Sequence, residues 1–181
     1  LHPRSAPETV AGAGAARPRP AVTTGMREVA LFFAQTGGQA LEPELRRIEV
    51  TTSTVENCRN ALRELVKGPA RALAPVIPAN VTVRALYLLN DGELVVDFSR
   101  ELQPESARER SMAIEALMAY GVANTLTQTD LRAADGPAVR RVRFLVEGEA
   151  SSESYPAHLD LSQPIGPGQH WVAAAGRSGN E

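Results

Sequence analysis

The middle of the chain has the sequence of a β-hairpin. In residues 81–89 every second residue is apolar, a period typical of a strand with one buried face. The turn sequence Asn90-Asp91-Gly92 follows, and it suits a tight turn that needs positive φ. The alternation resumes over residues 94–98. Because a doubly wound parallel sheet needs a helix between nearly all successive strands, this hairpin favours a mostly antiparallel sheet.

A helix is predicted before the hairpin. Ser53 followed by Glu56 forms a capping box, which marks a helix N-terminus. Gly68 and Pro69 end the helix, since Gly accepts positive φ and Pro blocks continuation. Apolar residues recur between these signals at helical spacing. They are Val55, Cys58, Leu62, Leu65 and Val66.

A second helix is predicted after the hairpin. Ser106 can cap it, with Glu109 at the third position, and it runs to about Thr127. Gly121 lies within its apolar stripe and would let a neighbouring element approach closely. The other residues of the stripe are Ile114, Leu117, Met118, Val122 and Leu126.

Three further apolar runs, residues 27–33, 46–51 and 142–146, are predicted strands. The order is strand, strand, helix, strand, strand, helix, strand. We therefore predict an α+β fold, in which a mostly antiparallel sheet carries two helices on one face in a split β-α-β arrangement. Leu62 and Leu117, in the middle of the two helical stripes, are expected in the core.

The chain length predicts one domain with flexible ends. Ala, Gly and Pro occupy thirteen of the first 25 positions, so residues 1–25 are expected to be a flexible, disordered linker. Residues 26–170 form the predicted domain, and 171–181 a disordered tail. The chain starts with Leu1 rather than Met, which suggests that an upstream segment was removed. No run reaches the roughly 18 apolar residues that span a bilayer.

Charge and cysteine content exclude several classes of function. The net charge is −2, and the nineteen Lys and Arg residues are spread along the chain without interleaved aromatics, so no nucleic-acid partner is expected. The single cysteine, Cys58, excludes an intramolecular disulfide and a cysteine-based metal cluster. Its place on a helical apolar stripe indicates a buried small hydrophobe rather than a thiolate nucleophile.

A search for catalytic residues finds no specific constellation. The three histidines, His2, His158 and His170, lack ligand spacing, and His158 would be the one plausible base of a triad. No serine lies in a Gly-x-Ser-x-Gly elbow. Asp97 should point away from the core, and Glu101 and Glu105 lie in a charged loop beside Arg100 and Arg108. No catalytic, cofactor-binding or metal-binding residue is predicted, no cofactor is expected, and the chain is not expected to be an enzyme.

Seven segments, in the same order, resemble the GerMN domain family. They are residues 29–33 (VALFF), 61–69 (ALRELVKGP), 76–78 (VIP), 94–99 (LVVDFS), 123–127 (ANTLT), 142–148 (VRFLVEG) and 158–164 (HLDLSQP). The resemblance covers residues 27–165. It implies a role of the sporulation and germination type and a fold similar to ring-building motifs. It also implies an extracytoplasmic location in the cell envelope, held by a lipoprotein or transmembrane anchor upstream of Leu1.

These observations lead to three functional hypotheses. The first is a non-enzymatic scaffold that binds an envelope protein partner or a second copy of itself. It would contact the membrane only through its anchor. The second is a receptor for a small envelope ligand such as a cell-wall fragment. The third is an enzyme, which the missing constellation disfavours.

One strand is a predicted interaction site. Residues 46–51 are expected at a sheet edge because Arg46, Arg47 and Glu49 are residues that a solvated edge tends to carry. Such an edge can pair with another chain, or its charges can simply prevent aggregation.

Overall fold

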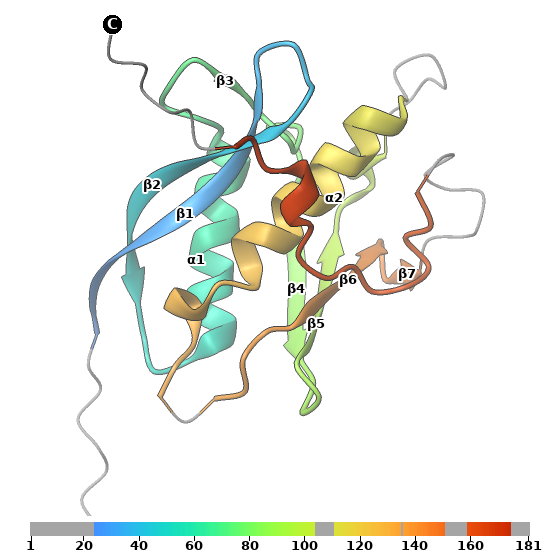
Figure 1. Ribbon diagram of the computed structural model, residues 1–181. Coiled ribbons are helices and arrows are strands. Elements are labelled where there is room, and N and C mark those ends of the chain that lie inside the picture. The colour runs from blue at the N-terminus through green and yellow to red at the C-terminus, as the bar shows by residue number, and fades with distance from the viewer. Residues whose placement is uncertain (1–23, 104–110, 135, 151–158, 175–181) are drawn as a thin grey trace, which may run out of the picture.

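The computed structural model describes residues 24–103, 111–134, 136–150 and 159–174. Its strands and helices follow the predicted order, with two short strands added (Figure 1). In chain order they are β1 (Gly25–Gln35), β2 (Leu41–Val50), α1 (Thr54–Lys67), β3 (Leu73–Ala74), β4 (Val83–Leu88), β5 (Glu93–Phe98), α2 (Met112–Leu126), β6 (Arg141–Val146) and β7 (Glu149–Ala150).

The strands form two sheets, with orders β2-β1-β3 and β4-β5-β6-β7. All neighbours are antiparallel except β5 and β6, which α2 connects. The predicted α+β class, mostly antiparallel pairing and two helices are confirmed. The prediction of one sheet is wrong, because β1 and β2 pair with each other in a separate sheet. The β-α-β unit is also not split, since β5 and β6 are direct neighbours.

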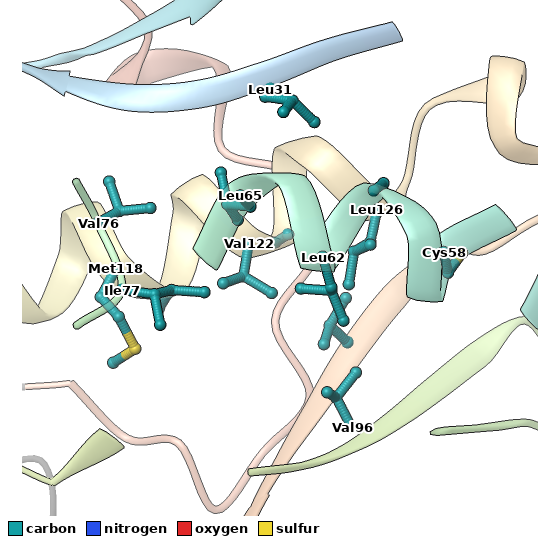
Figure 2. Packing of buried hydrophobic residues seen from close by; sticks show 14 of the residues in the cluster. Leu31, Cys58, Leu62, Leu65, Val76, Ile77, Val96, Met118, Val122 and Leu126 are labelled. Carbon is teal, nitrogen blue, oxygen red and sulfur yellow. The ribbon is translucent and has the colours of Figure 1, made fainter. Parts of the chain in front are cut away.

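The two helices form a layer between the sheets. α1 packs against β1 and β2 on one side and β4 on the other, and α2 packs against β1 and β6. Figure 2 shows Leu31 of β1 above the helices and Val96 of β5 below them. Leu62 is fully buried and Leu117 nearly so, which confirms both as core residues. α2 is buried almost all round from Glu115 to Leu126, since both sheets cover it.

The ends of α1 lie where predicted, but only half of the capping box forms, because the Ser53 N–H donates to Thr51 Oγ1 at 3.0 Å rather than to Glu56. The Ser53 hydroxyl accepts a hydrogen bond from the Glu56 N–H at 3.3 Å, and Gly68 follows the helix with φ of 88°. The side chain of Asn57 adds a further tie, because its amide donates to the Leu131 carbonyl at 3.0 Å. The first helix is therefore held both by its own caps and by the chain after α2.

The start of α2 differs from the prediction. Ser111 caps the helix by accepting a hydrogen bond from the Ile114 N–H at 3.2 Å, so the helix begins at Met112. The predicted cap, Ser106 with Glu109, lies outside the described residues. Ile114 is 58% exposed, so its assignment to the apolar stripe is wrong. The helix thus begins three residues before its first buried residue, Glu115.

The predicted hairpin is confirmed by the pairing of β4 with β5. Gly92 has φ of 85° at its turn, as the sequence requires. A Cβ at this position would also lie 2.7 Å from the Ala138 carbonyl oxygen. The turn therefore needs glycine for both its conformation and its close contact with the chain that leads into β6.

The described strands and contacts include Gly25 and residues 171–173, which lie just outside the predicted domain. β1 begins at Gly25, within the segment assigned to the linker. Residues 169–171 form a 3-10 helix, and the Ala173 N–H then donates to the Leu41 carbonyl at 2.8 Å. The chain thus stays attached to β2 up to Ala173. Residues 1–23 and 175–181, the rest of the expected linker and tail, lie outside the described residues.

Replacing Gly121 with valine is expected to lower the free energy of unfolding by about 1–2 kcal/mol. A Cβ there would lie 3.0 Å from Val76 Cγ2 and 3.2 Å from the Phe32 carbonyl oxygen, and the backbone oxygen cannot move aside easily. Urea unfolding measures the change. Gly25→Val is the control, because nothing lies within 4 Å of its Cβ position. An unchanged stability of Gly121→Val would contradict the close contact between α2 and β1.

Candidate functional site

The predicted edge strand is confirmed as an edge, but Arg46 is not a solvated edge residue. β2 ends the first sheet, and Arg47 and Glu49 are exposed. The Arg46 side chain instead points towards α1 and is largely buried. It lies 3.2 Å from the Glu64 carboxylate and donates to the Gly68 carbonyl at 3.0 Å. The expectation that Arg46 faces solvent is wrong, because it shares the inward face of β2 with Ile48.

Glu44 is the buried partner of Arg46. Its carboxylate accepts hydrogen bonds from Arg46 Nε at 2.7 Å, the Ala70 N–H at 3.1 Å and the Arg71 N–H at 3.0 Å. Burial by itself would raise the pKa of the Glu44 carboxyl, but these donors outweigh it and hold the pKa below its ordinary value. The cluster therefore holds β2 against the chain that follows α1.

The open side of β2 carries features that discourage strand pairing. Pro43 has no N–H to donate, and Glu44 is an inward-pointing charge. The Leu41 carbonyl is occupied by the Ala173 N–H, and the Glu49 carbonyl accepts a hydrogen bond from the Asn60 side chain at 3.0 Å. The charges of β2 therefore serve the fold and protect its edge.

The other side of the first sheet is also closed. Beyond the short strand β3, side chains near the end of α2 bond to the backbone of β1. Ala30 N–H donates to Gln128 Oε1 at 3.0 Å, and Phe32 N–H donates to Thr125 Oγ1 at 3.1 Å. Gln128 also donates to the Ala30 carbonyl at 2.8 Å. These bonds satisfy the side of β1 that faces away from β2.

The second sheet ends in β4, whose register with β5 shifts between Val83 and Ala85 and is regular from Ala85 to Leu88. Within the described part of the chain, β4 pairs only with β5. The Leu89 N–H donates to the Glu93 carbonyl at 2.9 Å, so the alternation of an antiparallel ladder directs the N–H and C=O groups of Leu86 and Leu88 away from β5. Tyr87 is 60% exposed and Leu89 46% exposed beside them. β4 contains no proline, and its one charge, Arg84, is exposed.

A hollow of about 330 Å³ lies beside the start of β4, between it and α1. Three cations of α1 line it together with Val66 and Val83, and no acidic side chain lines it. The cations are Arg59, Arg63 and Lys67. Their spacing of four residues places them in a row on one helix face, which we call the basic row. The row stands out in the sequence only when the cations are read at helical spacing, since those of the whole chain are spread evenly.

The remaining acidic candidates are bound into the fold where the structure describes them. Asp97 points away from the core, as predicted, and accepts a hydrogen bond from the Gly148 N–H at 2.8 Å. Glu93 pairs with Arg143 and lies 3.0 Å from Arg141, which ties β5 to β6. The Arg143 hydrogen bond contributes most to lowering the pKa of Glu93, against the opposing effect of burial.

Of the loop and histidine candidates, Glu101 and His170 lie in the described part of the chain. Glu101 lies in a short 3-10 helix, where a hydrogen bond with Ser99 contributes most to lowering its pKa. His170 packs edge-on against Tyr120 at 5.5 Å between ring centroids. The other members lie outside the described residues. They are Glu105, Arg108, His2 and His158.

Cys58 is expected to resist thiol reagents in the folded protein. The side chain is fully buried in the core, and burial raises the pKa of the thiol to about 12, so almost no thiolate forms near pH 8. Ellman's reagent should react at a rate set by unfolding, and adding urea should release the thiol. Rapid reaction without denaturant would place Cys58 at the surface and restore it as a candidate nucleophile.

The family follows from comparison with known proteins. A family model described as "Germane: Sporulation and spore germination" matches residues 30–152, more than half of the chain. The chain belongs to this GerMN family. The resemblance found in the sequence is thereby confirmed, and the protein contains a GerMN domain of the sporulation and germination type. A search of curated proteins finds no match.

Several solved structures are similar to this chain. One is described as "Putative Lipoprotein from Clostridium perfringens", with 20% identity, a TM-score of 0.51, and coverage of 78% of this chain and 88% of that one. Two others come from the sporulation protein GerM of Bacillus subtilis. Its tandem GerMN domains show 20% identity, a TM-score of 0.48 and coverage of 71% and 41%. Its first GerMN domain shows 17% identity, a TM-score of 0.47 and coverage of 83% and 98%.

Proposed function

We propose that this GerMN domain is a non-enzymatic, extracytoplasmic module that binds a protein partner through an exposed sheet edge. The observation that carries the proposal is the open edge of β4, with unpaired backbone groups and the exposed side chains of Tyr87 and Leu89. A backbone edge recognises another polypeptide by main-chain hydrogen bonding, which is a binding function and requires no catalytic group.

The buried polar groups support the same proposal because they have structural tasks. Glu44, Glu93 and Asp97 accept hydrogen bonds that join separate segments of the fold. Carboxylates held in this way are poor general bases, because donors already occupy their lone pairs.

An envelope location and a membrane anchor outside the domain are part of the proposal. Members of the GerMN family named for sporulation and germination, and a structural relative described as a lipoprotein, support them. No helix in the described ranges is long and apolar enough to cross a bilayer.

Photo-crosslinking in living cells tests the proposal. A photoreactive residue would replace Arg47 on β2 or Tyr87 on β4, with exposed Asp130 as the control position away from both edges. We expect one protein to be captured from an edge position and not from Asp130. If neither edge captures a protein and the purified domain retains a small molecule, the receptor hypothesis replaces the scaffold.

A further inference from the structure

The sheet edges at β2 and β4 are not equivalent. β2 has Pro43, the inward Glu44 and two occupied carbonyl groups along its edge. In the described part of the chain β4 has none of these features, and its backbone groups at Leu86 and Leu88 point away from β5, the strand with which it pairs. The structure therefore favours β4 as the edge that another strand would join.

The basic row lies where the side chains of an added strand would point. α1 packs on the inner face of β4, and Figure 1 shows the two elements alongside each other. A strand added to β4 would direct alternate side chains towards α1 and the others towards the outer face of the sheet. The inward side chains would meet Arg59, Arg63 and Lys67 at the hollow.

The spacing of the basic row matches that of an extended chain. Residues four apart on a helix rise by about 6 Å, and alternate residues of a strand by about 6.6 Å. Successive inward side chains of the added strand could thus each face one cation of the row. Arg63 has no carboxylate partner among the described ion pairs, and it donates only to the Asn60 side chain at 3.3 Å.

We propose that the β4 edge and the basic row together bind an extended segment of a partner protein in which acidic residues alternate with apolar ones. The acidic side chains face the basic row, and the apolar ones pack on the outer face beside Tyr87. This inference rests on the proposed protein-binding function and names the chemistry of the partner.

Charge also argues against a second copy as the occupant. Two-fold pairing of β4 with β4 would continue the sheet and place the two α1 helices side by side on one face. The basic row of each copy would then face the other, and like charges in contact disfavour the complex. An acidic segment would instead be attracted to the basic row.

A synthetic peptide of about eight residues that alternates Glu and Val is the probe, with Gln–Val and Lys–Val peptides as matched controls. We expect it to shift the amide NMR signals of Leu86 and Leu88 in the full chain. Changing Arg63 to glutamate should raise the Kd of the Glu–Val peptide by about tenfold or more, and added salt should raise that Kd further. Arg132→Glu, an exposed change in the segment between α2 and β6, should leave the Kd nearly unchanged.

Two proline variants test the backbone contacts. Leu88→Pro removes an outward N–H on β4 and should abolish binding, whereas Leu45→Pro does the same on β2 and should not. Equal binding of the acidic and Gln–Val peptides, or unchanged binding to Arg63→Glu, would overturn the inference. The inference would also be overturned if sedimentation showed a dimer of the protein that the Leu88→Pro change dissociates. In the cellular experiment, capture from Arg47 alone would refute this inference and leave the proposed function standing, whereas capture from neither edge would refute both.

Discussion

Replacing Leu62 with alanine is expected to lower the free energy of unfolding by about 2–5 kcal/mol. The side chain is fully buried between α1 and the second sheet, close to Val96 in Figure 2, so its removal leaves a cavity that both layers must close. Leu117→Ala should cost a similar amount from the other helix. Urea denaturation monitored by circular dichroism measures both changes.

The exposed Leu45 provides the matched control. It is 63% exposed, so Leu45→Ala should change stability by less than about 0.5 kcal/mol. If Leu62→Ala and Leu117→Ala also cost less than about 0.5 kcal/mol, the two leucines would not be core residues and the helix faces would be assigned wrongly.

Replacing Glu44 with alanine is expected to destabilise the protein by about 3 kcal/mol, near the lower end for breaking a buried pair. The change leaves the N–H groups of Ala70 and Arg71 without their acceptor and removes the closest anion of Arg46. Glu44→Gln keeps an acceptor oxygen and should lose less. Equal losses in the two variants would show that the charge, rather than the acceptor, stabilises the cluster.

The Glu44 carboxylate is also expected to make the stability of the protein depend on pH. Its folded-state pKa lies below the ordinary value of 4.5, so its contribution to stability is complete above about pH 4.5 and is lost as the pH falls through the folded-state pKa. The stability difference between the wild type and Glu44→Gln should therefore shrink as the pH is lowered from 6 towards about 3. A difference that stays constant over this range would rule out the ionised carboxylate as its source.

Local chemistry was sufficient to predict the hairpin and α1. The turn sequence at Asn90-Asp91-Gly92 and the cap at Ser53 act within a few residues, so no distant contact can easily override them. The separate first sheet was not predictable in this way, because any strand can pair with any other over long sequence distances. The composition of α2 held one clue: a helix that is apolar on nearly every face needs cover from two sides.

The site was predicted less completely than the fold. The inward position of Arg46 follows from strand alternation, since Ile48 and Val50 are buried at the same parity. The alternation is visible in the sequence, but the charge of Arg46 favoured the prediction that this side chain faces solvent. The open edge of β4 depends on which strand ends the sheet, and only the strand order provides that.

The bond between Ala173 and Leu41 has a mechanical consequence. It lies at one end of the β1–β2 ribbon, where Leu41 pairs with Ala34, whereas Gly25 lies at the opposite end, paired with Val50. The described chain therefore leaves the ribbon at opposite ends, as Figure 1 shows. Tension applied between the Gly25 and Ala173 ends of the described chain would act along the strands. The single hydrogen bond between Ala173 and Leu41 is in series with the β1–β2 ladder, so the C-terminal segment would detach from β2 before the ladder carried force in shear.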